Sequence, residues 1–269
     1  MNATRLRPLP SFTTGLRTEL RVIGALMVRD VMARYGHENI GFFWVIGEPI
    51  LLILGVMVLW SLTGQTHGAE DVGVIPFALT GYSYLTLWRH MAFKAMRVMR
   101  NGSNLVYHGN VTYFDVLISR GMLETVGIFA AFLITLLPFW LLKLAPGIHD
   151  PLLVVGGWLL CAWFSFAFSL IVAAASELSE AVEQFIGPMM YLTMPLTGAF
   201  FFVDWLPQRA QTVLLYSPMV HASEMFRAGL FPPDIATTYD VMYLLYWCIA
   251  LTMIAIPFVN YAQRHVQIS

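Results

Sequence analysis

The sequence predicts an all-α integral membrane protein with six transmembrane helices, an N-terminal amphipathic interfacial helix and short re-entrant helices before the last span. Three observations lead to this prediction. Of the 269 residues, 58% are hydrophobic and only 12% are charged, whereas charged residues make up about 25% of a typical soluble domain. Apolar stretches of about 20 residues, enough to cross a bilayer core about 30 Å thick, recur between short polar connections. Lysine and arginine gather in some connections and avoid others.

Residues 1–36 are predicted to form a cytoplasmic tail followed by the amphipathic helix. Apolar residues recur on one helical face from Leu16 through Leu20, Ile23 and Met27 to Val31, with arginines roughly opposite. Such a helix lies in the membrane interface, which we favour, or packs on cytoplasmic protein. Because no cleavable signal peptide is evident, the first membrane helix is expected to direct insertion.

A membrane domain is predicted over residues 37–263, with spans at about 40–62, 74–96, 116–142, 152–175, 184–202 and 241–261. Glu48 and Pro49 lie inside the first span, where both residue types are costly. Glu48 therefore faces a path through the protein or a neighbouring helix, or it is a structural carboxyl. Pro188 and Pro195 are expected to bend the fifth span. Residues 203–235 contain apolar runs too short to cross, which predicts re-entrant or interfacial helices.

The positions of the fifteen basic residues predict the orientation. With six spans, only Lys143, Arg209 and Arg227 fall on one side, and all the others fall on the other side. Positive charge accumulates in cytoplasmic loops. Both termini, including the short tail 264–269, are therefore expected in the cytoplasm.

Several chemistries are not expected of this chain. The sequence lacks the G-x-x-x-x-G-K-[ST] loop that cradles nucleotide phosphates, and it lacks H-E-x-x-H, G-x-S-x-G and a Cys/His cluster with metal spacing. Cys161 and Cys248 lie in separate apolar segments, so buried thiols are expected rather than a disulfide. Basic residues beside spans suit anionic lipid better than nucleic acid. We therefore expect no metal, no cofactor and no ATPase or other enzyme site in this chain.

Two stretches support a resemblance to a known family. The run Arg34–Trp44, followed by Glu48 and Pro49, resembles the start of the first span in type-2 ABC export permeases of polysaccharide systems. The stretch from Tyr216 to Arg227, which contains His221 and Glu224, is similar to that family's segment before the last span. Together with the six-span layout, they make the chain resemble the KpsM-type permease of group 2 capsular polysaccharide exporters.

The resemblance implies a homodimer bound to two KpsT-type ATPase subunits, which would bind ATP and Mg, and to a periplasmic KpsE-type co-polymerase. The implied substrate is a lipid-linked anionic capsular polysaccharide. Rival hypotheses are a permease for O-antigen, teichoic acid or drugs, a membrane-embedded enzyme acting on lipid-linked sugars, and a proton-coupled transporter. The enzyme hypothesis would depend on Glu48, a carboxylate inside the first predicted span.

Three groups of candidate site residues follow. Aromatic rings stack on sugar faces, so a substrate channel is predicted at Phe43, Trp44, Tyr82, Tyr84 and Trp88, with Glu48 beside them. The alternative is an ordinary aromatic belt at the membrane interface. A basic cytoplasmic mouth for an acidic polymer is predicted at Arg29, Arg34, Arg89, Lys94 and Arg97. The alternative is that these charges serve only to orient the chain.

The third group would contact the ATPase. A coupling helix is predicted at about residues 100–115, with contacts from Arg100, Tyr107, His108 and Asp115. Glu177, Glu180 and Glu183 are spaced three apart, which predicts one acidic side of a helical turn and a second contact. The alternative is that all of these are solvated loop residues.

Overall fold

The computed structural model describes residues 12–35, 72–96 and 111–266, together with Val98 and most of the positions from 47 to 62. Its helices are α1 (Phe12–Tyr35), α3 (Val74–Ala95), α5 (Tyr113–Leu141), α6 (Pro151–Leu178), α7 (Glu180–Leu192), α8 (Gln208–Leu214), α9 (Pro218–Leu230) and α10 (Val241–Val266). Short 3₁₀ helices, η1 (Met194–Thr197) and η2 (Val203–Trp205), connect α7 to α8. Within these described ranges the regular structure is helical throughout, in agreement with the all-α prediction.

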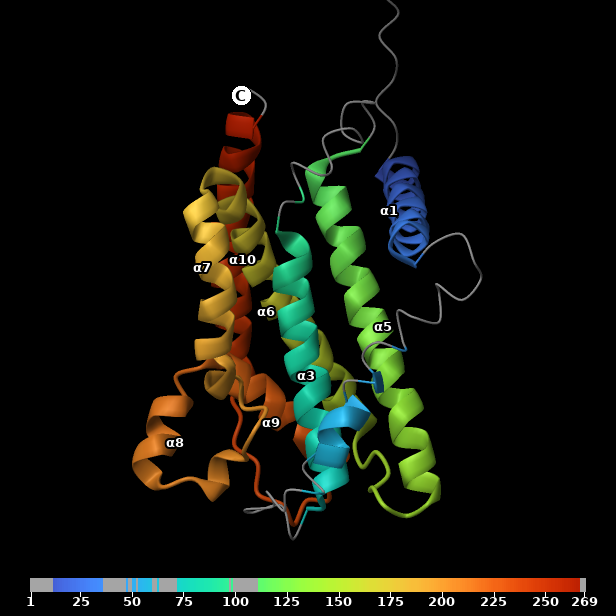
Figure 1. Ribbon diagram of the computed structural model, residues 1–269, viewed down its shortest axis with the longest axis vertical. Coiled ribbons are helices and arrows are strands. Elements are labelled where there is room, and N and C mark those ends of the chain that lie inside the picture. Colours follow the sequence, from blue (N-terminus) through green and yellow to red (C-terminus); the bar gives the residue numbers. More distant parts are fainter. Residues whose placement is uncertain are drawn as a thin grey trace, which may run out of the picture.

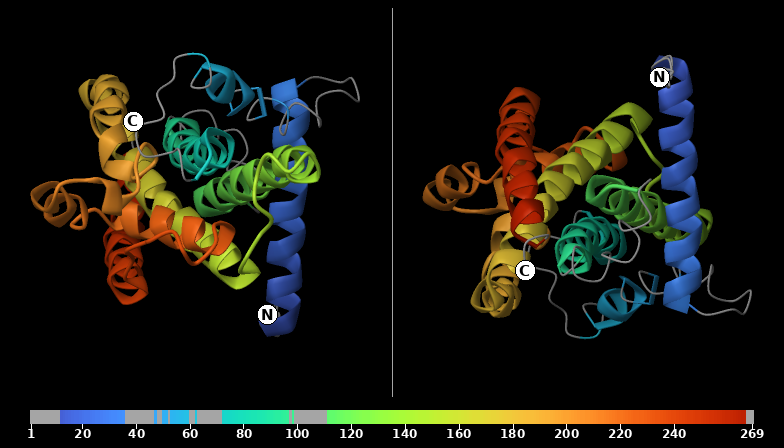
Figure 2. Two further views of the ribbon diagram at one scale, coloured as in Figure 1. Left: turned by 90° about the horizontal axis from the view of Figure 1, so that it is seen from below. Right: turned by 90° about the horizontal axis from the view of Figure 1, so that it is seen from above.

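The long helices form a bundle, and different short or crossing helices lie at its two ends. In Figure 1, α3, α5, α6, α7 and α10 run along the long axis of the molecule. Helix α1 and the end of α10 lie at one end of this bundle, and α8 and α9 lie toward the other. Figure 2 shows α1 along its length while α3 is seen nearly end-on, so α1 lies across the bundle. This is the orientation expected of a helix in the plane of a membrane interface.

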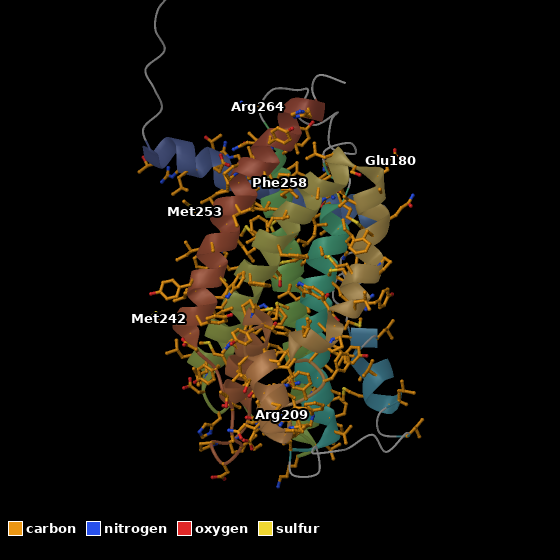
Figure 3. All side chains as sticks on the ribbon, turned by 90° about the vertical axis from the view of Figure 1, so that its left-hand side faces the viewer. Glu180, Arg209, Met242, Met253, Phe258 and Arg264 are labelled. Carbon is orange, nitrogen blue, oxygen red and sulfur yellow. The ribbon has the colours of Figure 1, made fainter. Side chains whose placement is uncertain are left out.

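Three helices are long and apolar enough to cross a membrane: α5, α6 and α10 over Val241–His265. Helix α6 is central, since 61% of its most apolar window is buried, against 17% for α10. The outer face of α10 carries large exposed apolar side chains, including Met242 and Met253, which Figure 3 labels. The chain is therefore an all-helical protein suited to a bilayer, and the full count of six spans stays a prediction.

Four predicted spans correspond closely to α3, α5, α6 and α10, whereas the first, at 40–62, falls mostly outside the described residues. The predicted fifth span, 184–202, is wrong in its bounds. Helix α7 ends at Leu192 and is followed by η1, which begins at Met194 with Pro195 in its first turn. Thirteen residues of α-helix reach only about 20 Å. Pro195 lacks the N–H group that would continue the α-helical hydrogen bonding, and the α-helix has ended before it. Pro188, in contrast, lies within α7.

Helix α9 is buried against α6 because glycines allow their backbones to approach closely. A Cβ added at Gly157 would lie 2.7 Å from the backbone nitrogen of Phe226. A Cβ added at Gly229 would lie 2.4 Å from the backbone nitrogen of Val154. The ring of Phe226 lies 5.7 Å from that of Trp158 on α6. The predicted re-entrant segment, 203–235, thus contains one buried helix, α9, and one short peripheral helix, α8.

Helix α1 contacts the bundle through a face that shares Ile23 with its predicted apolar face. Ile23, Leu26 and Asp30 are buried, whereas Leu16 and Leu20 are about half exposed. The buried positions are spaced three and four residues apart and face α5 and its neighbours. The exposed leucines are left available to lipid.

Candidate functional site

The predicted channel aromatics on α3 point in different directions. Tyr84 is fully buried, and its hydroxyl donates a 2.8 Å hydrogen bond to the carbonyl of Met219. Trp88 is buried beside Phe168, with ring centroids 6.1 Å apart. Only Tyr82 of these three is partly exposed, with its ring edge toward Phe200. Phe43, Trp44 and Glu48 lie outside the described residues, so the channel assignment stays a prediction.

The predicted basic mouth contains cations that already have partners in this chain. The ammonium of Lys94 lies 2.9 Å and 3.0 Å from the two carboxylate oxygens of Glu124, which is buried on α5. His90 approaches the same carboxylate at 3.1 Å. The guanidinium of Arg89 lies 5.4 Å from the ring centre of Tyr191 on α7. The side chains of Arg34 and Arg97 lie outside the described part of the chain.

A second charged contact ties α1 to the bundle. The carboxylate of Asp30, on α1, accepts a 3.1 Å hydrogen bond from Nε of Arg120 on α5 and a longer one from the neighbouring Arg29. Arg120 also donates through Nη1 to the carbonyl of Lys94 at the end of α3. We call the set Asp30, Arg120, Lys94 and Glu124 the charged junction. It joins α1, α3 and α5 at the α1 end of the bundle.

The predicted ATPase contacts are only partly described. Arg100, Tyr107 and His108 lie outside the described residues. Asp115 belongs to the first turn of α5, not to a separate coupling helix, because it forms a capping box with Thr112 that starts α5 at Tyr113.

The three glutamates of the predicted second contact do not share one helical turn. Glu177 is buried near the end of α6, and the extended residue Ser179 separates it from Glu180 and Glu183 in the first turn of α7. The break occurs because the Ser179 side chain caps α7. Glu180 lies at the same end of the molecule as Arg264 (Figure 3).

A buried polar network occupies the other end of the bundle, around Arg227 of α9. The guanidinium of Arg227 donates to the carbonyls of Gly198, Ala199 and Phe201, the first two at 2.8 Å. The guanidinium carbon also lies 4.7 Å from the ring centres of both Phe77 and Phe202, and these two rings stack on each other with centroids 5.7 Å apart. Arginine suits this position because its planar fork offers several donors while its faces stack on aromatic rings.

Glu224 and His221 continue the network along α9. The Glu224 carboxylate accepts hydrogen bonds from the backbone N–H groups of Val203, at 3.2 Å, and Thr238, at 3.0 Å. It also lies 4.0 Å from Arg227. Nδ1 of His221 accepts from the N–H of Asp240 at 2.9 Å. This leaves Nε2 as the donor to the carbonyl of Leu215, at 2.8 Å, and fixes a neutral imidazole.

We call Arg227, Glu224 and His221 the α9 network. Their side chains form hydrogen bonds with backbone N–H and carbonyl groups that have no hydrogen-bond partner within a helix. Irregular backbone inside a membrane protein requires such partners. The two ionised residues are held by backbone and by each other, so the network suits a structural lock rather than catalysis. These three residues fall in the stretch that is similar to the family's segment before the last span, and the sequence alone predicts no role for them. The available signal was a glutamate and an arginine three residues apart in an apolar, proline-rich segment.

Comparison with known proteins agrees with this architecture. A family model described as ABC-2 type transporter matches residues 21–231. The chain belongs to the ABC-2 type transporter family. The match includes the charged junction and all three members of the α9 network, so both features lie in the part of the chain that defines this ABC-2 protein.

Named relatives of this ABC-2 chain align over almost its whole length. It is 31% identical over 257 residues to the capsule polysaccharide export inner-membrane protein BexB of Haemophilus influenzae, covering 96% of this chain and 97% of that protein. It is 32% identical over the same shares to the capsule polysaccharide export inner-membrane protein CtrC of Neisseria meningitidis serogroup B. The polysialic acid transport protein KpsM of Escherichia coli is 22% identical over 86% of this chain and 89% of its own.

Proposed function

We propose that this chain is the membrane-spanning permease subunit of an ATP-driven exporter that moves lipid-linked capsular polysaccharide across the bacterial inner membrane. The observation that carries the proposal is the identity of about one residue in three to two capsule polysaccharide export proteins along nearly the entire length of both chains. The match is not confined to one motif, so it supports a shared role for the whole subunit.

The proposed topology has six spans and both termini in the cytoplasm. It is supported by the position of α1 and the end of α10 at one end of the bundle, and by the accumulation of lysine and arginine in the segments assigned to that end. Residues 203–235 then lie toward the periplasm, where the α9 network closes that end of the bundle.

The energy for export comes from a separate ATPase subunit that binds ATP and Mg. This is supported by the absence of a phosphate-binding loop in the sequence. Residues 100–110, with Glu180 and Glu183 of α7, form the contact with that subunit. Movement there passes into α3 and α5 and, through the charged junction, into α1. Glu177 is too buried to take part directly.

Two copies of the chain, each with one ATPase subunit, would enclose the path of the polymer, and a periplasmic co-polymerase would receive it. On α3, the described members of the predicted site whose side chains remain partly exposed are Tyr82, Arg89 and Lys94, and Lys94 is already paired with Glu124. A sugar can stack on the tyrosine ring, and a carboxylate or phosphate can bind the guanidinium. Tyr84 and Trp88 support the helix from inside the subunit.

Purification of the tagged chain with its candidate ATPase in mild detergent tests the proposal. We expect a stable complex in which ATP hydrolysis increases when lipid-linked capsular polymer is added. O-antigen and teichoic acid precursors serve as matched controls and should have less effect. A chain that binds no ATPase, or a complex that responds to O-antigen but not to capsular polymer, would remove the capsule exporter as the explanation.

A further inference from the structure

A surface groove runs along the end of α5 that is remote from α1. Its apolar part has a volume of about 620 Å³ and is lined by Leu133, Ile134, Leu136, Leu137, Trp140, Gly147 and Ile148. A second hollow of about 370 Å³ shares Trp140 and Gly147 with it and extends to Lys143. Volumes of this size are typical of ligand sites. The groove is therefore apolar along the helix and polar at its mouth.

Two hydrogen-bond donors stand at this mouth. Lys143 is exposed, and it forms no ion pair with any acidic side chain that the structure describes. Trp140 is half exposed, and its indole nitrogen lies against Gly147, where an added Cβ would be only 2.9 Å away. In the described part of the chain this indole N–H donates to no acceptor. Both donors are thus free to bind a ligand.

The backbone at Lys143 is held in a conformation that glycine would adopt more easily. Its φ is 59°, and it is the non-glycine residue with positive φ among the described positions. A position just after a helix end usually carries glycine when φ is positive. Lysine there is intrinsically disfavoured, although a cation at a helix C-terminus gains some electrostatic stabilisation. A strained cation at the mouth of a groove suggests a role in binding.

We propose that this groove binds an anionic phospholipid of the leaflet on the α8 side of the membrane. The lipid's acyl chain lies against Leu133, Ile134 and Leu137, and its phosphate accepts hydrogen bonds from Lys143 and Trp140. Tryptophan and lysine are the residues that anchor proteins at the lipid headgroup level. Charge complementarity selects this occupant, because a groove made for a protein helix would not need a free cation at its rim.

Native mass spectrometry of the purified full chain with added phosphatidylglycerol or phosphatidylcholine tests the site. The wild-type chain is expected to retain phosphatidylglycerol in preference to phosphatidylcholine. Lys143→Gln should weaken phosphatidylglycerol binding about tenfold, as expected for loss of one charge-assisted contact. Leu137→Trp should fill the groove and abolish retention. Arg209→Gln removes an exposed cation at the same end but outside the groove (Figure 3), and it should bind as the wild type does.

Lys143→Gly separates binding from folding. It relieves the positive φ, so we expect its apparent unfolding temperature in lipid-free detergent to be equal to or higher than that of the wild type, while phosphatidylglycerol binding falls as in Lys143→Gln. Equal phosphatidylglycerol binding by Lys143→Gln and the wild type would overturn the proposal. So would an equal loss in Arg209→Gln. A change from dimer to monomer in Leu137→Trp would assign the groove to a second copy of the chain instead.

Discussion

At the scale of single residues, Arg227 combines roles that no other side chain could replace. It binds three carbonyls of the turn that follows η1, and its guanidinium packs against two aromatic rings that stack on each other. The side chain is 1% exposed. A charge this deeply buried is tolerated only when hydrogen bonds and a counter-charge replace water.

Replacing Arg227 by methionine should therefore destabilise the protein by about 3–5 kcal/mol, the usual cost of removing one partner of a buried charge pair and leaving the other uncompensated. Lysine should recover only part of this loss, because it lacks the planar fork. Thermal unfolding in detergent, followed by the reaction of a thiol dye with the buried Cys161 and Cys248, measures the effect. Arg209→Met is the control, since Arg209 is exposed. An unchanged unfolding temperature for Arg227→Met would refute the structural lock.

Glu19 gives the contact between α1 and α5 a dependence on pH. A hydrogen bond to the Asp115 carboxylate, followed by repulsion from its charge, raises the pKa of Glu19 above its usual value of 4.5. A raised folded-state pKa means that this contribution to stability is complete below the unfolded pKa and is lost as pH rises through the folded pKa. Protonated Glu19 thus favours docking of α1.

Glu19→Gln should remove this dependence, because glutamine keeps a hydrogen-bond donor and carries no charge at any pH. The unfolding temperatures of the variant and the wild type should be close near pH 4 and should separate as pH rises toward 7, with the variant more stable. Scans at several pH values measure the difference. A difference that is constant across this range, or that shrinks as pH rises, would show that the pKa of Glu19 is not raised in the folded protein.

The sequence could not predict which side chains form ion pairs with one another in the site. Lys94 and Arg29 were identified as basic side chains near a membrane end, but the carboxylates they meet, Glu124 and Asp30, had no local signal. Arg120 and Asp30 are 90 residues apart. Such pairs depend on how helices pack, which periodicity within one helix does not specify.

At the scale of elements, the close packing of α9 against α6 depends on glycines. A Cβ at Gly157 would contact backbone atoms of Phe226, which cannot move as a flexible side chain can. The carbonyl of Gly229 also accepts hydrogen bonds from the N–H groups of His149 and Asp150. The start of α6 and the end of α9 are therefore fixed together.

Gly157→Ala is expected to destabilise the protein by about 1–3 kcal/mol, the usual cost of overpacking. Gly187→Ala on α7 is the matched control, because nothing lies within 4 Å of the added Cβ there. In the control, the better helix propensity of alanine should leave stability equal or slightly higher. If both variants unfold at the same temperature, close α6–α9 packing is not what holds α9 in place.

The helices themselves were largely predictable, because a long, periodic apolar stretch bounded by capping residues leaves few alternatives to a helix. The bounds of α6 follow from Asp150 and Pro151 at its start. The exceptions lie around residues 176–202, where a serine cap divides α6 from α7 and proline ends α7 early. An acidic run that looked like one helical turn was divided by that cap, which competes with helix continuation.

At the scale of the whole molecule, the two ends of the bundle are predicted to face different compartments. Single cysteines at Arg264 and Arg209 test this, because these residues lie at opposite ends (Figure 3) and the native cysteines are buried. In intact cells, an impermeant thiol reagent should label Arg209→Cys and should not label Arg264→Cys. Labelling of both, or only of Arg264→Cys, would contradict the proposed orientation.

Whole-molecule function was accessible from the sequence through composition, missing nucleotide motifs and a resemblance. The three-dimensional arrangement of the helices and side chains could not be predicted from the sequence. Neither the position of α1 across the bundle nor the burial of Tyr84 and Trp88 follows from their local sequence. Aromatic residues on a membrane helix give the same sequence pattern whether they face a channel, lipid or the protein interior.

The most direct test of the account is transport itself. Inside-out vesicles containing this chain and its ATPase subunit should take up lipid-linked capsular polymer when ATP and Mg are supplied. Uptake should fall to background without ATP, and vesicles with the ATPase alone should show none. Uptake that persists without the ATPase subunit, or that follows a proton gradient in place of ATP, would contradict the assignment of this chain as an ATP-driven export permease.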